Sequence, residues 1–165
     1  PTGLFAADRA TRDFVKGLLE ELLPCFPRAT SVNLGGDEFF DLGQGRSQTD
    51  DKATLYLGYM REMADVALRQ GKRPELWADM LIRHPEILPQ VKAILPEVRW
   101  LVWGYEATDP IGEYAARLRA EGLEVVVCPG TSSWRSFCGK HNFHACRRRC
   151  FMVHNTVVSR QKRLI

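Results

Sequence analysis

Two adjacent acids, Asp37 and Glu38, follow a short predicted strand and two glycines, Gly35 and Gly36. Residues 31–34 are typical of a strand, and the glycines let the backbone turn sharply at its carboxyl end. Parallel α/β proteins place their catalytic groups at these strand ends. Neighbouring carboxylates are costly there unless a partner, a metal or a substrate uses them. The pattern favours a functional pair over solvated loop acids or the first turn of a helix, which is the alternative interpretation.

The elements that would position these acids alternate along the chain. Apolar residues at helical spacing predict helices over residues 8–23, 52–70, 85–95 and 111–120. Strands are predicted over residues 31–34, 74–80, 98–105 and 123–128. This alternation predicts an α/β fold with a parallel sheet and helices outside it. Right-handed crossovers then place all four carboxyl ends on one face of the sheet.

Aromatic and acidic side chains recur at the ends of the later predicted strands. They are Trp77, Asp79, Trp103, Tyr105 and Trp134. For Trp77 the sequence leaves a core position and a site position equally open, and Asp79 can equally cap the helix that follows. Trp100 is predicted to lie in the core. The gathering of these residue types with Asp37 and Glu38 at one face predicts a functional site there.

The segment from Gly35 to Glu38, after a helix that ends in Phe26-Pro27, resembles the catalytic signature of glycoside hydrolase family 20, the β-N-acetylhexosaminidases. In that family the fourth strand of a (β/α)₈ barrel ends in His-x-Gly-Gly-Asp-Glu. The two glycines and two acids match one for one, and Asn33 stands where the family has His. The resemblance covers residues 14–139. It implies a partial (β/α)₈ TIM barrel of about four parallel β/α units, strands four to seven, without the first strand and its substrate-clamping Arg. An open doubly wound sheet is the alternative.

The resemblance also implies a reaction, the removal of terminal β-linked N-acetylhexosamine by substrate-assisted retaining catalysis. The 2-acetamido carbonyl of the sugar would be the nucleophile. Glu38 would be the general acid, with a pKa raised by partial desolvation. Asp37 would orient the acetamido N–H and stabilise the oxazolinium intermediate. The substrates would be N-acetylglucosamine or N-acetylgalactosamine glycosides, and no metal or organic cofactor is implied.

The strand-end aromatics have matching roles in this resemblance. Trp77, Trp103 and Trp134 would enclose the acetamido group. Asp79 would bind a sugar hydroxyl, and Tyr105 would donate to the acetamido oxygen. A degenerate or non-catalytic carbohydrate-binding fragment of the same fold is the alternative function.

The chain changes character near Gly139. Residues 135–165 hold eight of the 23 Lys and Arg and no acid, a net charge of +8 against −5 for residues 1–134. Six potential zinc ligands lie there in an unfamiliar spacing: Cys138, His141, His144, Cys146, Cys150 and His154. A zinc or nucleic-acid module is the third candidate function. The preferred interpretation is a partial barrel over residues 1–139 and an irregular basic tail over 140–165 that is non-native or read in a shifted frame, with no nucleic-acid partner.

The bulk composition, 45% apolar and 26% charged, is typical of a globular protein. No apolar run has the length that crosses a bilayer, so no membrane partner is expected. The chain begins with Pro1 rather than Met, as a fragment would. A partial barrel leaves strand edges unpaired and an inner apolar face uncovered. We therefore expect the chain alone to be inactive and poorly soluble.

Overall fold

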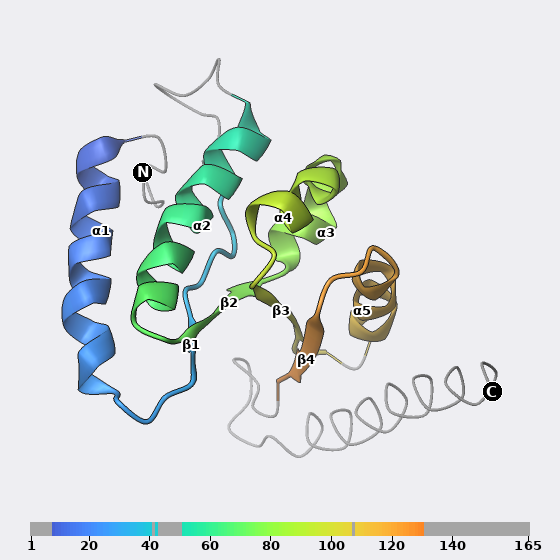
Figure 1. The fold of residues 1–165 in the computed structure, drawn as a ribbon. Coiled ribbons are helices and arrows are strands. Elements are labelled where there is room, and N and C mark those ends of the chain that lie inside the picture. The colour runs from blue at the N-terminus through green and yellow to red at the C-terminus, as the bar shows by residue number, and fades with distance from the viewer. Residues whose placement is uncertain (1–7, 41, 43–50, 107, 131–165) are drawn as a thin grey trace. The chain divides into compact units, whose positions relative to one another are not determined.

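The computed structural model describes residues 8–40, 42, 51–106 and 108–130, with helices and strands alternating along the chain (Figure 1). The α-helices are α1 (Arg9–Leu22), α2 (Lys52–Arg69), α3 (Asp79–Arg83), α4 (Leu88–Ile94) and α5 (Ile111–Ala120). The strands are β1 (Ser31–Asn33), β2 (Arg73–Trp77), β3 (Arg99–Gly104) and β4 (Val125–Pro129), and two short 3₁₀ helices are η1 (Leu23–Cys25) and η3 (Pro85–Ile87). The predicted succession of helices and strands is confirmed, with α3 and the 3₁₀ helices added.

The four strands form one parallel sheet in the order β1-β2-β3-β4. In the β1–β2 pair, which is parallel, Val32 lies opposite Pro74. Each strand therefore neighbours the strands that precede and follow it in sequence. A doubly wound sheet reverses its strand order at a switch point, whereas a barrel does not. The order of the described strands confirms the predicted α/β class and favours the barrel over the doubly wound alternative.

The chain divides into two compact units, residues 1–100 and 101–165. The first holds α1 to α4 with β1 and β2, and the second holds α5 and β4. The division falls within β3, after Trp100, which is fully buried as predicted. The boundary predicted near Gly139 and the basic tail lie outside the described residues.

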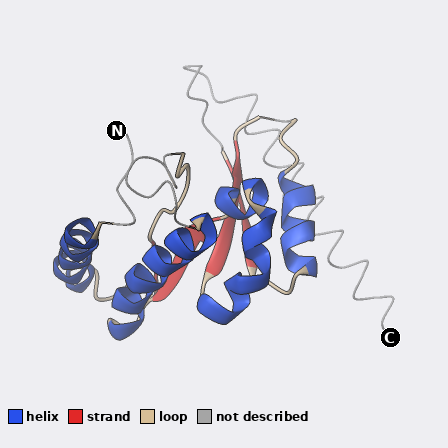
Figure 2. Cartoon of the chain, turned by 90° about the horizontal axis from the view of Figure 1, so that it is seen from above, coloured by secondary structure: helices blue, strands red, loops and turns tan. Residues whose placement is uncertain are grey.

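Helix α2 supplies much of the core of the first unit. Asp51 begins the helix by accepting the Thr54 backbone N–H at 2.8 Å. Its buried side chains are Ala53, Tyr56, Leu57, Tyr59, Met60, Met63, Ala64, Val66 and Ala67. The helix packs against β2. Figure 2 distinguishes the helices, strands and loops by colour. The buried apolar side chains of α2 thus pack against both α1 and β2.

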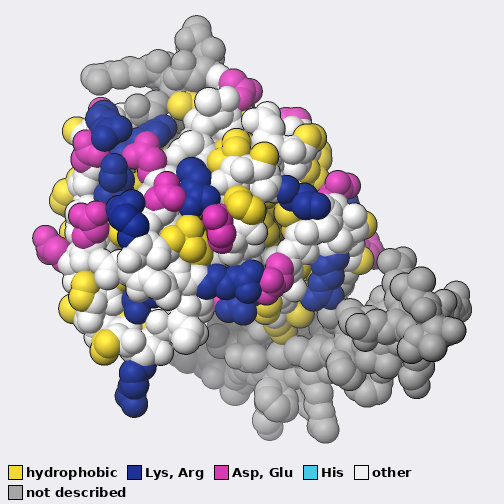
Figure 3. All heavy atoms as spheres, viewed as in Figure 1, with side chains coloured by type: hydrophobic (Ala, Val, Ile, Leu, Met, Phe, Trp, Pro, Cys, Tyr) yellow, Lys and Arg dark blue, Asp and Glu magenta, His cyan; other side chains and the backbone are white. Residues whose placement is uncertain are grey.

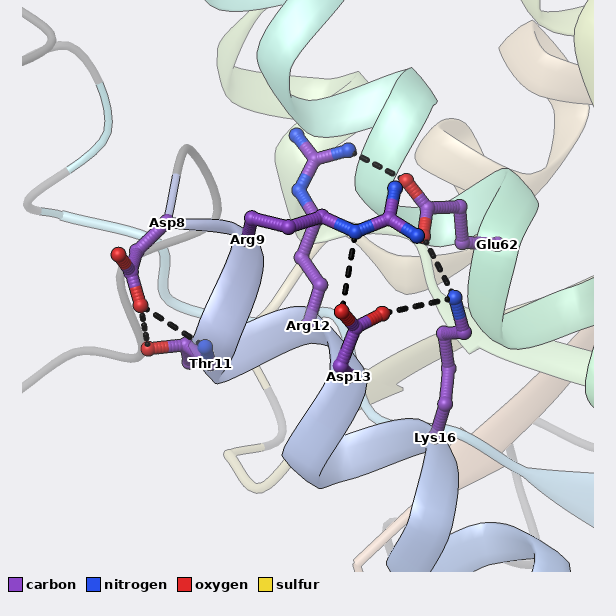
Figure 4. Close-up of polar contacts among 7 residues, drawn as sticks. All are labelled: Asp8, Arg9, Thr11, Arg12, Asp13, Lys16 and Glu62. Carbon is purple, nitrogen blue, oxygen red and sulfur yellow. Dashed lines mark hydrogen bonds and ion pairs between the residues drawn. The ribbon is translucent and has the colours of Figure 1, made fainter.

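Helix α1 lies beside α2 (Figure 1) and is joined to it by ion pairs. Asp8 caps the helix by accepting the Thr11 backbone N–H at 2.8 Å. Arg12 and Lys16 both contact the carboxylate of Glu62 on α2, at 2.7 and 3.2 Å (Figure 4). The Arg12 guanidinium lowers the pKa of Glu62 below its usual range. The side chains of Arg12, Lys16 and Glu62 are 17%, 23% and 26% exposed, so water still screens the pairs and each contributes little stability. The pairs therefore orient α1 more than they stabilise its packing.

The region after β2 differs from the prediction. The strand predicted to reach Met80 ends at Trp77, and residues 79–83 form the short helix α3. The helix predicted over residues 85–95 is divided into η3 and α4. Pro85 and Pro89 each stand in a first turn, where the missing N–H of proline is tolerated, and a proline inside a longer helix would break its hydrogen bonds.

The surface carries charges of both signs. On the face shown in Figure 3, Lys and Arg side chains alternate with Asp and Glu side chains over α1 and α2. Within the described part of the chain, helices long and apolar enough to span a membrane are not found.

Apolar side chains also stand out on α1 and just after it. Phe14, Leu18 and Leu22 recur at every fourth residue of α1 and are 65%, 49% and 51% exposed. Phe26 follows at the same spacing and is 56% exposed. The three helical residues, Phe14, Leu18 and Leu22, lie on one side of α1 and form a row that we call the apolar row of α1. Contiguous apolar surface of this kind promotes association between molecules.

Replacing Leu18 with glutamine is expected to reduce self-association of the chain, because it interrupts the apolar row without removing a core contact. Sedimentation velocity measures the association. The matched control is Leu19→Gln, since Leu19 packs against the core cluster of Leu23, Val66 and Ala67. That control should lower the free energy of unfolding by about 1–2 kcal/mol. It should not reduce the self-association of the chain. Unchanged sedimentation of Leu18→Gln would show that the row does not drive association.

Candidate active site

The loop that carries Asp37 and Glu38 follows β1. The Leu34 N–H donates to the Glu75 carbonyl, and the Trp77 N–H donates to the Gly35 carbonyl, both at 2.9 Å. These bonds extend the pairing with β2 past the last residue of β1. The two acids therefore follow directly after the paired segment, at the carboxyl end of the strand as predicted.

The two glycines are required by the backbone and by the packing beneath it. Gly35 and Gly36 have φ angles of +78° and +84°, in the left-handed region that favours glycine. A Cβ on Gly36 would lie 3.1 Å from the Met60 sulfur and 3.2 Å from the Tyr56 hydroxyl oxygen. The loop thus approaches α2 more closely than a larger residue allows.

Tyr56 is a residue of the site that the sequence analysis missed. Its hydroxyl donates to the Gly36 carbonyl at 3.1 Å, and its side chain is fully buried. Burial raises the pKa of Tyr56, and the nearby acids Asp79 and Asp37 raise it further, so the phenol stays protonated and remains a donor. The Phe39 ring packs edge-on against the Tyr56 ring, with 5.6 Å between centroids. The periodic placement of Tyr56 on α2 signals burial, but nothing in the sequence pairs it with Gly36.

Asp79 lies beneath the loop. Its Oδ2 accepts the backbone N–H of Glu38 at 2.9 Å, and its side chain is buried, with 7% exposed. Burial raises the pKa of Asp79, the hydrogen bond from Glu38 opposes this, and the charge of Asp37 adds to it. Its other oxygen, Oδ1, has no hydrogen-bond partner among the described residues. In the structure the Asp79 carboxylate thus contacts the backbone of Glu38. The predicted contact of Asp79 with a sugar hydroxyl stays a prediction.

The carboxyl groups of Asp37 and Glu38 are both exposed. The desolvation predicted for Glu38 is thus not supplied by the described residues. The Asp37 Oδ1 lies 3.8 Å from the position that a Cβ on Gly35 would take, so this carboxylate sits over the first glycine. Asn33 accepts the Gly35 N–H at 2.8 Å and so stabilises the start of the turn.

The predicted aromatic residues are divided between the two units. Trp77 ends β2 in the first unit and is half-buried. Trp103 and Tyr105 belong to the second unit, where their rings pack with 5.4 Å between centroids. Trp134 lies outside the described residues. The Trp77 backbone pairs with Gly35 of the loop, and the site roles of Trp77, Trp103, Tyr105 and Trp134 stay predictions.

A metal site within the described residues would require several ligating side chains close together. In residues 8–40, 42, 51–106 and 108–130, no group of three or more His, Cys, Asp and Glu side chains is arranged to hold an ion. The Cys and His residues predicted as possible zinc ligands all lie beyond that part of the chain.

Two solved structures have a similar fold. One is the chitobiase of Flavobacterium johnsoniae, a GH20 protein, with a TM-score of 0.53 and 20% identity over 74% of this chain and 19% of that one. The other is the GH20 β-N-acetylhexosaminidase of Streptomyces coelicolor A3(2), with a TM-score of 0.48 and 17% identity over 78% of this chain and 22% of that one. The chain has the fold of part of a family 20 glycoside hydrolase.

This finding confirms the resemblance to family 20 at the level of the fold. The chain spans about a fifth of the length of these structures, at 19% and 22%. Neither a family model nor a curated protein matches the sequence. At such low identity the similarity concerns the partial barrel and not the reaction.

Proposed function

We propose that this chain carries the catalytic acids of a glycoside hydrolase that removes terminal β-linked N-acetylhexosamine. The observation that supports this most is the position of Asp37 and Glu38, exposed on a tightly held Gly-Gly turn at the carboxyl end of β1. Barrel enzymes place their catalytic groups at this end of their strands. The fold shared with a family 20 chitobiase supports the same substrate class.

In the proposed reaction the substrate supplies its own nucleophile. The 2-acetamido carbonyl oxygen attacks the anomeric carbon while the glycosidic oxygen leaves with the proton of Glu38. Asp37 accepts the acetamido N–H and offsets the positive charge of the oxazolinium ring. Water, deprotonated by Glu38, then attacks the anomeric carbon from the face of the departed group, and the bond from that carbon to the oxazolinium oxygen breaks, which restores the acetamido group. The anomeric configuration is retained, and Glu38 ends protonated.

In this proposal the bound substrate also has to exclude water from Glu38, because this residue is exposed in the structure. A general acid works best when its pKa lies near the operating pH, and loss of water from a carboxyl group raises its pKa. A sugar bound over the loop would exclude water from Glu38. Trp77, Trp103 and Trp134 are proposed to form the walls around its acetamido group, and Tyr105 is proposed to donate to the acetamido oxygen.

A non-catalytic carbohydrate-binding chain is the second candidate. It is favoured by Asn33, which stands in place of the family's His and whose side chain is engaged with the adjacent Gly35 N–H. Such a chain would bind N-acetylhexosamines without cleaving them.

The distinguishing assay uses two nitrophenyl glycosides that differ only at carbon 2, the N-acetyl-β-glucosaminide and the β-glucoside. The longest chain that the gene encodes is expected to release nitrophenol from the first and not from the second. Asp37→Asn should lower the first rate, because it removes the charge opposite the oxazolinium. Equal cleavage of both glycosides would contradict substrate assistance. Binding of N-acetylglucosamine without release would identify the non-catalytic candidate.

A further inference from the structure

Glu38 has an unusual backbone conformation. Its φ angle is +53°, and among the described residues it is the one non-glycine residue with a positive φ. The left-handed region is unfavourable for a side chain with a Cβ, so surrounding contacts must hold the residue there. Strain of this kind gathers at functional sites.

The contacts of Glu38 show what holds it. Its N–H donates to the Asp79 Oδ2 at 2.9 Å, and its carbonyl accepts the Phe40 N–H at 2.7 Å. The second bond lies within the loop. The bond to Asp79 joins the loop to a different element, 41 residues later in the chain. Among the described contacts of Glu38, the hydrogen bond to Asp79 is therefore the one that connects this residue to another element of the fold.

Asp79 is itself fixed in place. It is the first residue of α3 and stands between Ala78 and Met80, which are 0% and 2% exposed. Its Oδ1 is buried without a hydrogen-bond partner among the described residues. A buried carboxyl group with an unsatisfied oxygen is costly, and its presence calls for an explanation. Holding the Glu38 backbone provides one.

We propose that Asp79 is a positioning residue, whose carboxyl group holds the Glu38 backbone in the left-handed conformation and so directs the Glu38 carboxyl group. The catalytic part of this inference rests on the proposed function, whereas the conformational part does not. Asp37 has a separate support, because Gly36 before it is held by the Tyr56 hydroxyl. Loss of the Asp79 carboxylate should therefore displace the Glu38 carboxyl group more than the Asp37 carboxylate.

The conformational part is tested by NMR on the ¹⁵N-labelled form of the longest chain that the gene encodes, because residues 1–165 alone are expected to be poorly soluble. In the parent chain the coupling between the Glu38 amide and α protons should correspond to a positive φ, and the amide should be protected from hydrogen exchange. Asp79→Ala should change the coupling and remove the protection. Asp79→Asn, which keeps an acceptor oxygen, should preserve both. The control is Asp8→Ala, which removes the same kind of bond at the start of α1 and should leave the Glu38 signals unchanged.

The catalytic part is tested on the longest chain that the gene encodes. Asp79→Ala is expected to lower kcat for the nitrophenyl N-acetyl-β-glucosaminide by about 10²-fold, since a small misplacement of a catalytic group has an effect of that size. KM should change by less than about twofold. Asp79→Asn should recover most of kcat. Asp8→Ala should change neither constant.

Several results would overturn the inference. An unprotected Glu38 amide in the parent chain would do so even if Asp79→Ala does not fold. So would an unchanged Glu38 coupling in a folded Asp79→Ala chain. A parent chain with the expected NMR signals but no glycosidase activity would retain the conformational role and refute the proposed function. A kcat for Asp79→Asn as low as for Asp79→Ala would refute positioning through the acceptor oxygen.

Discussion

Replacing Glu38 with glutamine is expected to lower kcat/KM for N-acetyl-β-glucosaminides by about 10²–10⁴-fold, the usual contribution of a general acid. Glutamine keeps the size and the backbone contacts of Glu38 but has no acidic proton to donate. The loss should depend on the leaving group. A sugar alcohol needs the proton as its bond breaks, whereas nitrophenolate is stable without it. We therefore expect a larger loss on the N,N′-diacetyl disaccharide than on the nitrophenyl glycoside.

The measurement is a comparison of kcat/KM on both substrates for the longest chain that the gene encodes. The matched control is Glu21→Gln, the same change at an exposed position of α1. It should leave both rates unchanged. Equal losses on the two substrates would point to a damaged site rather than a missing acid. An unchanged rate in Glu38→Gln would show that the acid lies elsewhere.

Replacing Gly36 with alanine is expected to destabilise the fold by about 2–5 kcal/mol. The φ angle of +84° costs a residue with a Cβ about 1–2 kcal/mol. The new methyl group would press on the Met60 sulfur, the Tyr56 hydroxyl and a Leu76 methyl, at 3.1, 3.2 and 3.4 Å. Overpacking in a closed core costs about another 1–3 kcal/mol. Denaturant unfolding of the chain measures the sum.

Gly58→Ala provides the control for this prediction. Gly58 lies within α2, and a Cβ there would meet no atom within 4 Å. Alanine is the better helix former, so the same substitution should stabilise the chain by about 0.5–1 kcal/mol. If both substitutions changed the free energy of unfolding equally, the turn would be able to relax around a Cβ. The position of Gly36 would then not be held by its packing against α2.

The sequence by itself determined the local elements. The apolar spacing predicts α2 and α5 nearly residue for residue. The alternation of helix and strand correctly predicted parallel pairing. The turn at Gly35 and Gly36 was also readable, because positive φ is a property of glycine itself. Each of these features depends on residues a few positions apart, and for such features composition and spacing carry the information.

Only the tertiary structure decided how the candidate site is supported. The sequence predicted a strand to Met80, whereas the chain turns into α3 after Trp77 and places Asp79 under Glu38. The contact of Tyr56 with Gly36 was likewise not predicted. These contacts depend on the register of β1 against β2 and on how closely α2 approaches the loop. Register and packing are set by the whole core at once, so no local pattern around Glu38 could specify that Asp79 would hold its backbone.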